Sequence, residues 1–276
     1  MTHPDAAAGP LDPDTDDSAV TGAFVAHRAH LRFALLQVRN PGDPTREDEL
    51  VAFCDKLGVR RGQVRILDAL SERLGPESTE GVDALLVGGS GQYSVLDDDP
   101  RIRAFVDYLA AVSDSGLPVF ASCFGYQGLV LGLGGEVIAA EDRAEVGTYD
   151  LWLTPEGGAD PLFSALGPQF LAQLGHKDQA VRLPAGLVNL ASSERTPNQA
   201  LRMEGRPVYG TQFHPEMSWR ENRGRFLRYM KEYGKLFGDE AAQRQLDSHR
   251  PSEAANALLG RFVDQVVLGR VEGGAL

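Results

Sequence analysis

Short, almost wholly apolar runs alternate with amphipathic segments between residues 31 and 135. The runs at 31–38, 63–67, 83–87 and 118–122 have the length of strands, whereas 46–57 and 100–112 carry apolar residues at helical spacing. Continuous apolar strands separated by helices are typical of a parallel sheet that is covered on both faces. We therefore predict an α/β fold: a three-layer sandwich with a mainly parallel, flavodoxin-like or Rossmann-like central sheet.

The pattern changes after residue 135, where short apolar runs follow one another with little helical signal between them. They lie at 136–138, 149–154, 170–174, 187–191, 200–203 and 208–213. This spacing predicts a small antiparallel extension of the sheet. From residue 219 the pattern becomes helical, with one helix over 219–233, a polar stretch over 238–250 that carries no strong core signal, and an amphipathic helix after Pro251.

Three parts of the chain are expected from these patterns. Residues 1–28 are rich in Asp, Ala, Pro and Gly and read as an acidic, disordered or loosely attached tail. Residues 29–234 are expected to form the main α/β domain, and residues 235–276 a C-terminal helical extension. We expect the last helix to pack on its own domain, because most amphipathic helices dock intramolecularly, with a partner interface as the alternative.

Composition and charge narrow the classes of partner. Of the 276 residues, 42% are hydrophobic and 24% are charged, which is ordinary for a globular protein. The net charge of −12 argues against nucleic acid or an anionic membrane as a partner, since both would repel the chain. No apolar run reaches the ~20 residues that span a bilayer, and the first twenty residues show no signal peptide. We expect a cytoplasmic location.

One of the two cysteines lies where an apolar strand gives way to an amphipathic segment. Cys123 follows the run at 118–122, and Phe124 opens the next segment. Such a strand-to-helix elbow lifts a nucleophile over a helix N-terminus, where backbone amides favour a thiolate and can hold an oxyanion. The alternative, a small core residue, fits Cys54 better than Cys123. A nucleophilic Cys123 needs a reducing compartment.

A second chemical pattern closes the run at 208–213, where the chain reads His214-Pro215-Glu216. Positions i and i+2 of a strand share a face, so Glu216 is expected to accept a hydrogen bond from His214 and orient its ring. Glu216 could instead open the next helix and favour its N-terminus by charge alone. Cysteine, base and orienting carboxylate are the parts of an activated thiol nucleophile.

In these blocks the sequence resembles the class I (triad-type) glutamine amidotransferases over roughly residues 30 to 234. The resemblance rests on residues 83–90, on the Cys-x-Gly-x-Gln pattern at 123–127, and on residues 145–147, 175–178 and 214–216. It implies a stand-alone domain that releases ammonia from the glutamine side chain through a γ-glutamyl thioester. Either a separate synthetase or other acceptor protein would then use the ammonia, or the enzyme would act alone. No cofactor is implied, and the scattered histidines show no metal-site spacing.

The resemblance also implies roles for individual residues. Cys123, His214 and Glu216 would form the catalytic triad. The amides of Gly89 and Phe124 would form the oxyanion hole. Substrate would be bound by Gln127, Gly88 and His176. His176 and Asp178 could also hydrogen-bond to each other and brace a loop near the site. Two departures from the family pattern are Ala121, where many members carry glycine, and the loop at 88–93, where Ser-Gly-Gly-Pro is commoner.

Two other functions stay open at this stage. A γ-glutamyl peptidase or hydrolase would keep the triad and release an amine in place of ammonia, and the size of the pocket beyond the leaving nitrogen would distinguish it. A non-catalytic scaffold would retain the triad without using it, but the presence of all three triad residues argues against decay. The expected small-molecule partner is therefore L-glutamine or another γ-glutamyl compound.

Overall fold

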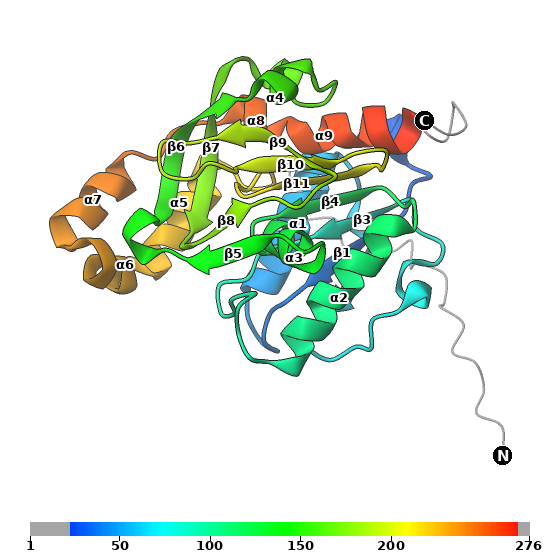
Figure 1. Ribbon diagram of the computed structural model, residues 1–276, viewed down its shortest axis with the longest axis horizontal. Helices are drawn as coiled ribbons and strands as arrows, with labels where there is room; N and C mark the ends of the chain where they lie inside the picture. The colour runs from blue at the N-terminus through cyan, green and yellow to red at the C-terminus, as the bar shows by residue number, and fades with distance from the viewer. Residues whose placement is uncertain (1–22, 270–276) are drawn as a thin grey trace.

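A nine-stranded sheet forms the centre of the computed structural model, which describes residues 23–269 (Figure 1). In spatial order it contains β2 (Val64–Asp68), β1 (Phe33–Gln37), β3 (Ala84–Val87), β4 (Val119–Ser122), β11 (Val208–Thr211), β10 (Ala200–Met203), β9 (Leu187–Ser192), β6 (Glu145–Leu153) and β7 (Gln169–His176). The strands from β2 to β11 are parallel, and the remaining pairings are antiparallel. The predicted α/β sheet with an antiparallel extension is confirmed.

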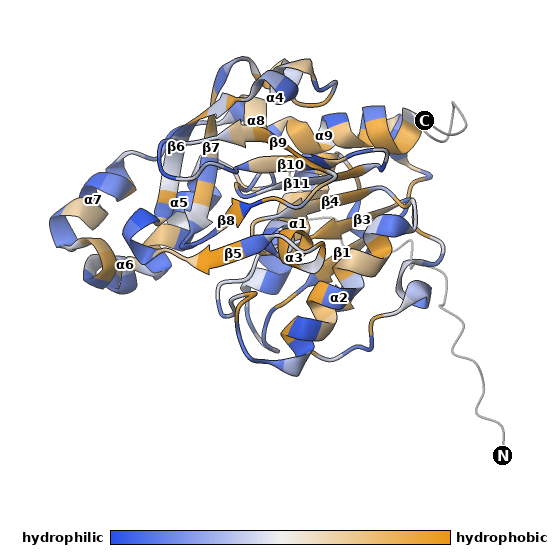
Figure 2. Cartoon of the chain, in the orientation of Figure 1, coloured by the Kyte–Doolittle hydropathy of each residue, from blue (hydrophilic) through white to orange (hydrophobic). Residues whose placement is uncertain are grey.

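Helices cover both faces of the parallel strands. The helices α1 (Thr45–Leu57) and α9 (Leu258–Phe262) contribute to the apolar cluster on one face, whereas α2 (Pro100–Asp114) and α3 (Phe124–Gly132) contribute to the cluster on the other. Side chains alternate along β4, so Phe120 enters the first cluster and Ala121 the second. Figure 2 shows the resulting run of hydrophobic residues along the central strands and α9.

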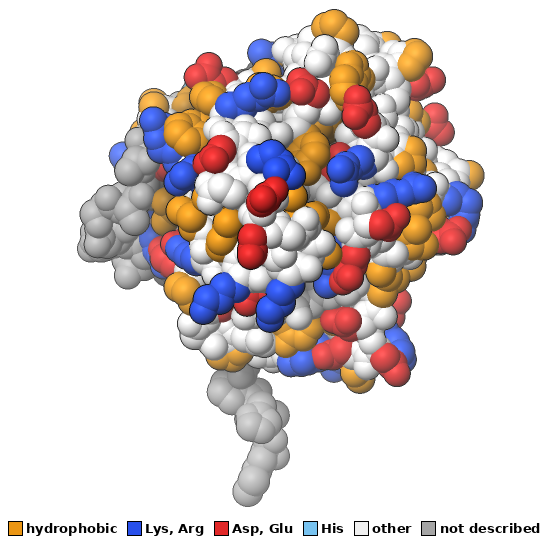
Figure 3. Space-filling model, turned by 90° about the vertical axis from the view of Figure 1, so that its left-hand side faces the viewer, with side chains coloured by type: hydrophobic (Ala, Val, Ile, Leu, Met, Phe, Trp, Pro, Cys, Tyr) orange, Lys and Arg blue, Asp and Glu red, His pale blue; other side chains and the backbone are white. Residues whose placement is uncertain are grey.

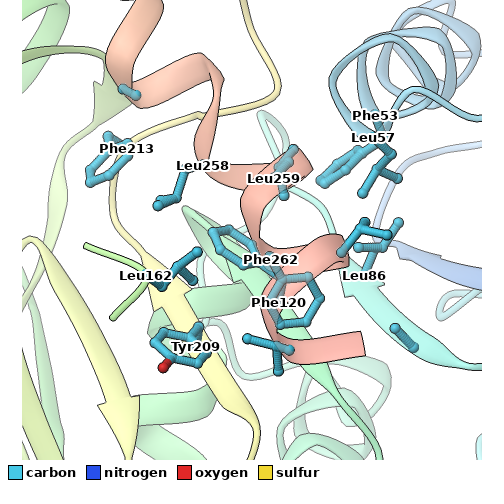
Figure 4. Packing of buried hydrophobic residues seen from close by; sticks show 14 of the residues in the cluster. Phe53, Leu57, Leu86, Phe120, Leu162, Tyr209, Phe213, Leu258, Leu259 and Phe262 are labelled. Atoms are coloured by element: carbon cyan, nitrogen blue, oxygen red, sulfur yellow. The ribbon is translucent and has the colours of Figure 1, made fainter. Parts of the chain in front are cut away.

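The C-terminal helices pack onto the sheet rather than projecting from it. After α8 (Glu253–Asn256) and α9, the chain continues as a π-helical turn, η6 (Val263–Leu268). Phe262 is fully buried, with its ring centroid 5.3 Å from Phe120 and 6.3 Å from Tyr209 (Figure 4). The expectation that the last helix docks on its own domain is therefore confirmed.

In the sequence between β11 and α8, the chain forms a small helical projection at one side of the molecule (Figure 1). The single helix expected over 219–233 is two helices, α5 (Trp219–Arg228) and α6 (Met230–Phe237), which meet at Tyr229. The boundary expected at residues 234 and 235 falls inside α6. A further helix, α7 (Asp239–Asp247), occupies the polar stretch over 238–250. That stretch carries no strong core signal because α7 buries only Ala242 and Leu246, which pack against Val146 and Phe226.

Two shorter elements complete the fold. The helix α4 (Pro155–Ala159) packs on β9, and a two-stranded sheet pairs β5 (Glu136–Ala139) with β8 (Asp178–Arg182). The strand β8 has no apolar run in the sequence, since its first two residues, Asp178 and Gln179, are polar and nevertheless buried. Their buried side chains are hydrogen-bonded: Asp178 accepts from the Ser94 hydroxyl, and Gln179 donates to the Arg143 carbonyl at 3.1 Å.

Only the end of the expected N-terminal tail can be described, because residues 1–22 lie outside the described part of the chain. Residues 23–28 contact the domain: the Val25 amide donates to the Gly58 carbonyl at 2.9 Å. Arg28 is buried and pairs with Asp264 at 2.7 Å. Within residues 23–269, no helix is both long enough and apolar enough to cross a membrane.

We predict that the C-terminal helix is part of one cooperative unit with the sheet. Phe262→Ala should lower the free energy of unfolding by about 3–5 kcal/mol, because it leaves a cavity against Phe120. Leu227→Ala, at an exposed position of α5, should change it by less than about 0.5 kcal/mol. Urea denaturation monitored by fluorescence measures both. A Phe262→Ala variant as stable as the control would show that the helix does not support the core.

Candidate active site

Strand register brings the predicted site residues to one edge of the sheet. The strand β4 lies between β3 and β11, and all three are parallel. Val87 is level with Ala121, and Ser122 is level with Thr211. The residues that follow these strand ends, Gly88, Cys123 and Gln212, therefore emerge side by side, and sites in such sheets form beyond the carboxyl ends of strands.

Cys123 occupies the elbow that the sequence predicts. It is the one non-glycine residue with a positive φ (51°) among residues 23–269, and α3 begins at the next residue. Its amide donates to the Thr211 carbonyl at 2.7 Å. A Cβ on Gly125 would lie 2.6 Å from the Val87 side chain, so only glycine allows α3 to approach β3 this closely. The backbone thus turns sharply at Cys123, and the side chain is nearly buried.

His214 and Glu216 form the expected pair, although the strand does not bring them together. Their Nδ1 and Oε1 atoms lie 2.6 Å apart, and both side chains are buried. The strand β11 ends at Thr211, so the strand-face argument is wrong; the pair lies in the turn that follows, where the Met217 amide donates to the His214 carbonyl. Because Glu216 holds Nδ1, only the other ring nitrogen of His214 is left for a further partner.

The opposite charges of His214 and Glu216 shift the pKa values of both side chains. Burial alone would lower the pKa of His214, but the Glu216 carboxylate and the Cys123 sulfur outweigh it and raise that pKa to about 9. Burial would raise the pKa of Glu216, but the His214 ring and a 3.0 Å hydrogen bond from the Ser122 hydroxyl lower it. At neutral pH the pair is therefore an imidazolium bonded to a carboxylate.

Gln127 lines the site, but its side-chain amide already donates hydrogen bonds to two other groups of the protein. Its Nε2 donates to the Asp178 carbonyl at 2.9 Å and to Gln212 Oε1 at 3.1 Å. Gln212 in turn places its Nε2 3.7 Å from the Cys123 sulfur. Sequence reasoning missed Gln212, although its position directly after the strand beside Cys123 was a usable signal.

The Gly88-Gly89 loop also differs from the expectation. The Gly89 amide donates to Glu49 Oε1 at 3.1 Å, so in this conformation its single N–H is not free for an oxyanion. The Gly88 amide is bonded to the Leu36 carbonyl. Within the described part of the chain, the amides of Ser90 and Phe124 are bonded to no acceptor. The oxyanion-hole roles of Phe124 and Gly89 stay predictions; in this conformation the Phe124 amide is available to an acceptor and the Gly89 amide is not.

His176 contacts Asp178, but through the backbone. The Nδ1 of His176 lies 3.0 Å from the Asp178 carbonyl, whereas the Asp178 carboxylate accepts from the Ser94 hydroxyl at 2.5 Å. The other ring nitrogen of His176 lies 3.2 Å from Glu145, which is fully buried and also accepts from Thr196. The expected side-chain bond between His176 and Asp178 is therefore wrong, and the carboxylate nearest to the His176 ring is that of the buried Glu145.

A cavity of about 700 Å³ opens beside Cys123 and His214. Its floor comes from the strand ends, and its roof comes from the last residues of α5 and from α6, with Arg225, Tyr229 and Tyr233 among the lining side chains. Figure 3 views the molecule from the side where α6 and α7 project, with side chains of both charges scattered over that face. A second cavity of about 480 Å³ includes Pro207, just before β11, and so lies at the amino ends of the strands, away from Cys123.

Comparisons with known proteins agree with this arrangement. A glutamine amidotransferase from Thermotoga maritima superimposes with a TM-score of 0.62 at 20% identity, covering 86% of this chain and 98% of that one. One from Methylobacillus flagellatus gives a TM-score of 0.58 at 18% identity, covering 86% and 96%. At these identities the likeness shows a shared fold.

Sequence relatives identify the family. A glutamine-hydrolyzing GMP synthase subunit of Sulfolobus acidocaldarius is 32% identical over 145 residues, which are 52% of this chain and 73% of that protein. The glutamine-hydrolyzing GMP synthase of Nitratiruptor is 31% identical over 135 residues, and the match covers 48% of this chain and only 25% of that relative. The family described as Glutamine amidotransferase class-I matches residues 54–230. The chain therefore belongs to the class I glutamine amidotransferase family.

Proposed function

We propose that this chain hydrolyses the side-chain amide of glutamine and releases ammonia, with Cys123 as the nucleophile. The observation that carries the proposal is that Cys123, on a strained elbow, lines the same cavity as His214, whose ring is bonded to Glu216 at 2.6 Å. Family membership supplies the substrate class, and the burial of the three side chains keeps the reacting charges away from bulk water.

In the first step the Cys123 thiolate attacks the carboxamide carbon and forms a carbon–sulfur bond, while the carbonyl oxygen becomes an oxyanion. The Phe124 amide, at the N-terminus of α3, is free to donate to that oxygen. Gln212 Nε2 donates toward the sulfur at 3.7 Å and so orients the Cys123 side chain before attack. Gln127 fixes the orientation of the Gln212 amide by donating to its oxygen.

In the following steps His214 acts first as acid and then as base. Its imidazolium gives a proton to the leaving nitrogen and the carbon–nitrogen bond breaks. Ammonia departs, and a γ-glutamyl thioester remains on Cys123. The ring then removes a proton from water, which attacks the thioester and releases glutamate and the thiolate. Glu216 holds the ring through Nδ1 during both transfers.

The fate of the ammonia is proposed from the relatives. The Sulfolobus relative is named as one subunit of its synthase, and the chain spans about a quarter of the length of the first curated relatives. We infer that a separate synthetase protein accepts the ammonia from this chain.

A second candidate keeps the chemistry and enlarges the substrate. The roof helix α6 lies almost wholly beyond the segment that matches the family, and the cavity of about 700 Å³ is of the size that holds drug-sized ligands. Glutamine would fill only part of it. A γ-glutamyl hydrolase, whose leaving group is an amine, is therefore the alternative that the cavity favours.

Active-site labelling and product analysis test both candidates. Intact-mass spectrometry after incubation with a glutamine-mimicking chloroketone should show one adduct on the wild type, blocked by excess glutamine, and none on Cys123→Ala. Glutamate release from glutamine should be absent in that variant. Faster release from a γ-glutamyl dipeptide than from glutamine would support the second candidate. A variant that still turns over either substrate would overturn the role of Cys123.

The elbow gives a stability prediction. Because Cys123 is held at a φ of 51° with a ψ of −102°, a residue without a Cβ should fit better there. Cys123→Gly should therefore unfold at higher denaturant concentration than Cys123→Ala, by about 1 kcal/mol or more. Both variants lack the thiol, so each is the other's control. Equal stabilities would mean that the elbow carries no strain.

The pH dependence of turnover tests the His214–Glu216 pair. A raised folded-state pKa means that the ring stays protonated until the pH rises through about 9, so kcat/KM should fall on the alkaline side around that value. Glu216→Gln removes the charge that raises this pKa, and should move the alkaline midpoint down by about 1–3 pH units. Its rate should stay above that of Cys123→Ala. An unchanged midpoint would exclude Glu216 as the cause.

A further inference from the structure

A buried arginine–glutamate pair lies under the Gly88-Gly89 loop. Arg39 and Glu49 expose only 2% and 3% of their surfaces. The guanidinium donates to both carboxylate oxygens, from Nη2 to Oε1 at 2.7 Å and from Nε to Oε2 at 3.2 Å. This two-point contact fixes the orientation of the carboxylate as well as its position.

The same carboxylate binds the loop. Glu49 Oε1 accepts from the Gly89 amide at 3.1 Å, and Oε2 accepts from Gln37 Nε2 at 2.9 Å. A Cβ on Gly88 would lie 2.6 Å from the Glu49 carboxyl carbon, so the loop rests directly on this group. With four hydrogen bonds, the carboxylate is fully occupied.

The other side of the loop faces the catalytic pair. A Cβ on Gly89 would lie 3.1 Å from His214 Cε1 and 3.8 Å from Cys123 Cβ. The next residue, Ser90, lines the cavity beside Cys123, and its amide is bonded to no acceptor among residues 23–269. A loop held between a fixed carboxylate and the nucleophile can present this free amide in only a narrow range of directions.

Stability alone is a poor explanation for such a pair. Two buried charges lose their hydration, and replacing a buried ion pair by apolar side chains of similar size is often neutral or stabilising. The electrostatic reach of the pair points to the site instead. Burial would lower the pKa of Arg39, but Glu49, and more weakly Asp43 and Glu216, raise it. The guanidinium therefore also lies within the field of the triad carboxylate.

We propose that Arg39 and Glu49 are positioning residues for the oxyanion site. By fixing the Gly89 amide, they set the peptide that follows, so that the Ser90 amide joins the Phe124 amide as a donor to the carbonyl oxygen of the substrate. This inference rests on the proposed function, because it assigns the second oxyanion donor of that reaction to Ser90 in place of Gly89.

The test changes both members together, since removing one would leave an unpaired buried charge. In Arg39→Met/Glu49→Met the loop loses its anchor while the volume is kept. Losing one aligned oxyanion donor should lower kcat for glutamine about 10²–10³-fold, with a smaller change in KM. Alkylation of Cys123 by iodoacetamide forms no oxyanion, so its rate and its pH midpoint, measured on the Cys123 peptide by mass spectrometry, should match the wild type.

A second buried arginine, Arg28, which pairs with the half-exposed Asp264, supplies the control. Arg28→Met/Asp264→Met removes a 2.7 Å contact at the C-terminal helix and should leave kcat unchanged. An unchanged kcat in the Arg39/Glu49 variant would overturn the inference. So would a parallel fall in turnover and alkylation, because the pair would then support the nucleophile or the fold.

Hydrogen exchange separates this inference from the proposed function. The Gly89 amide should exchange slowly in the wild type and faster in the Arg39/Glu49 variant, while the control variant exchanges as the wild type does. If the wild type turns over neither glutamine nor a γ-glutamyl dipeptide, the proposed function fails. The exchange rates then still judge the anchor, and equal rates in all three proteins would overturn it.

Discussion

The level at which three parallel strands end is the constraint on which the rest of the site depends. The strands β3, β4 and β11 are paired so that their last residues lie side by side, and the loop glycines, Cys123 and Gln212 follow directly. Alternate residues of β4 enter the cores on opposite faces, Phe120 on one and Ala121 on the other. A slip of one residue would exchange these faces, so the packing of both cores fixes the position of Cys123 along the strand direction.

Sequence patterns predicted the parts of the fold that are governed by apolar periodicity. The parallel strands, α1, α2 and the elbow at Cys123 lie within a few residues of the expected ranges. The strand β8 and helix α7 were missed because their buried residues are polar or few. Both β8 and α7 depend on contacts with residues that are distant in the sequence, and apolar periodicity cannot reveal such contacts.

The sequence identified most residues of the candidate site, but it predicted fewer of the hydrogen bonds that they make. The His214–Glu216 pair was expected on a strand face, but a turn after the strand forms it. The Gly89 amide was expected to face the substrate, but Glu49, forty residues earlier in the chain, accepts from it. Hydrogen bonds between distant segments depend on the full fold, so a local motif identifies the chemical groups without their partners.

The cavity combines two kinds of support. Its floor is built from strand ends that both cores hold in place, whereas its roof belongs to α5 and α6, which rest on the small cluster of Val146, Phe226, Ala242 and Leu246. Substitutions in the roof therefore perturb few tertiary contacts, while substitutions in the floor perturb many. Under the proposed function, selectivity and bond-breaking chemistry belong to separate segments, so an evolving lineage could exchange one while leaving the other intact.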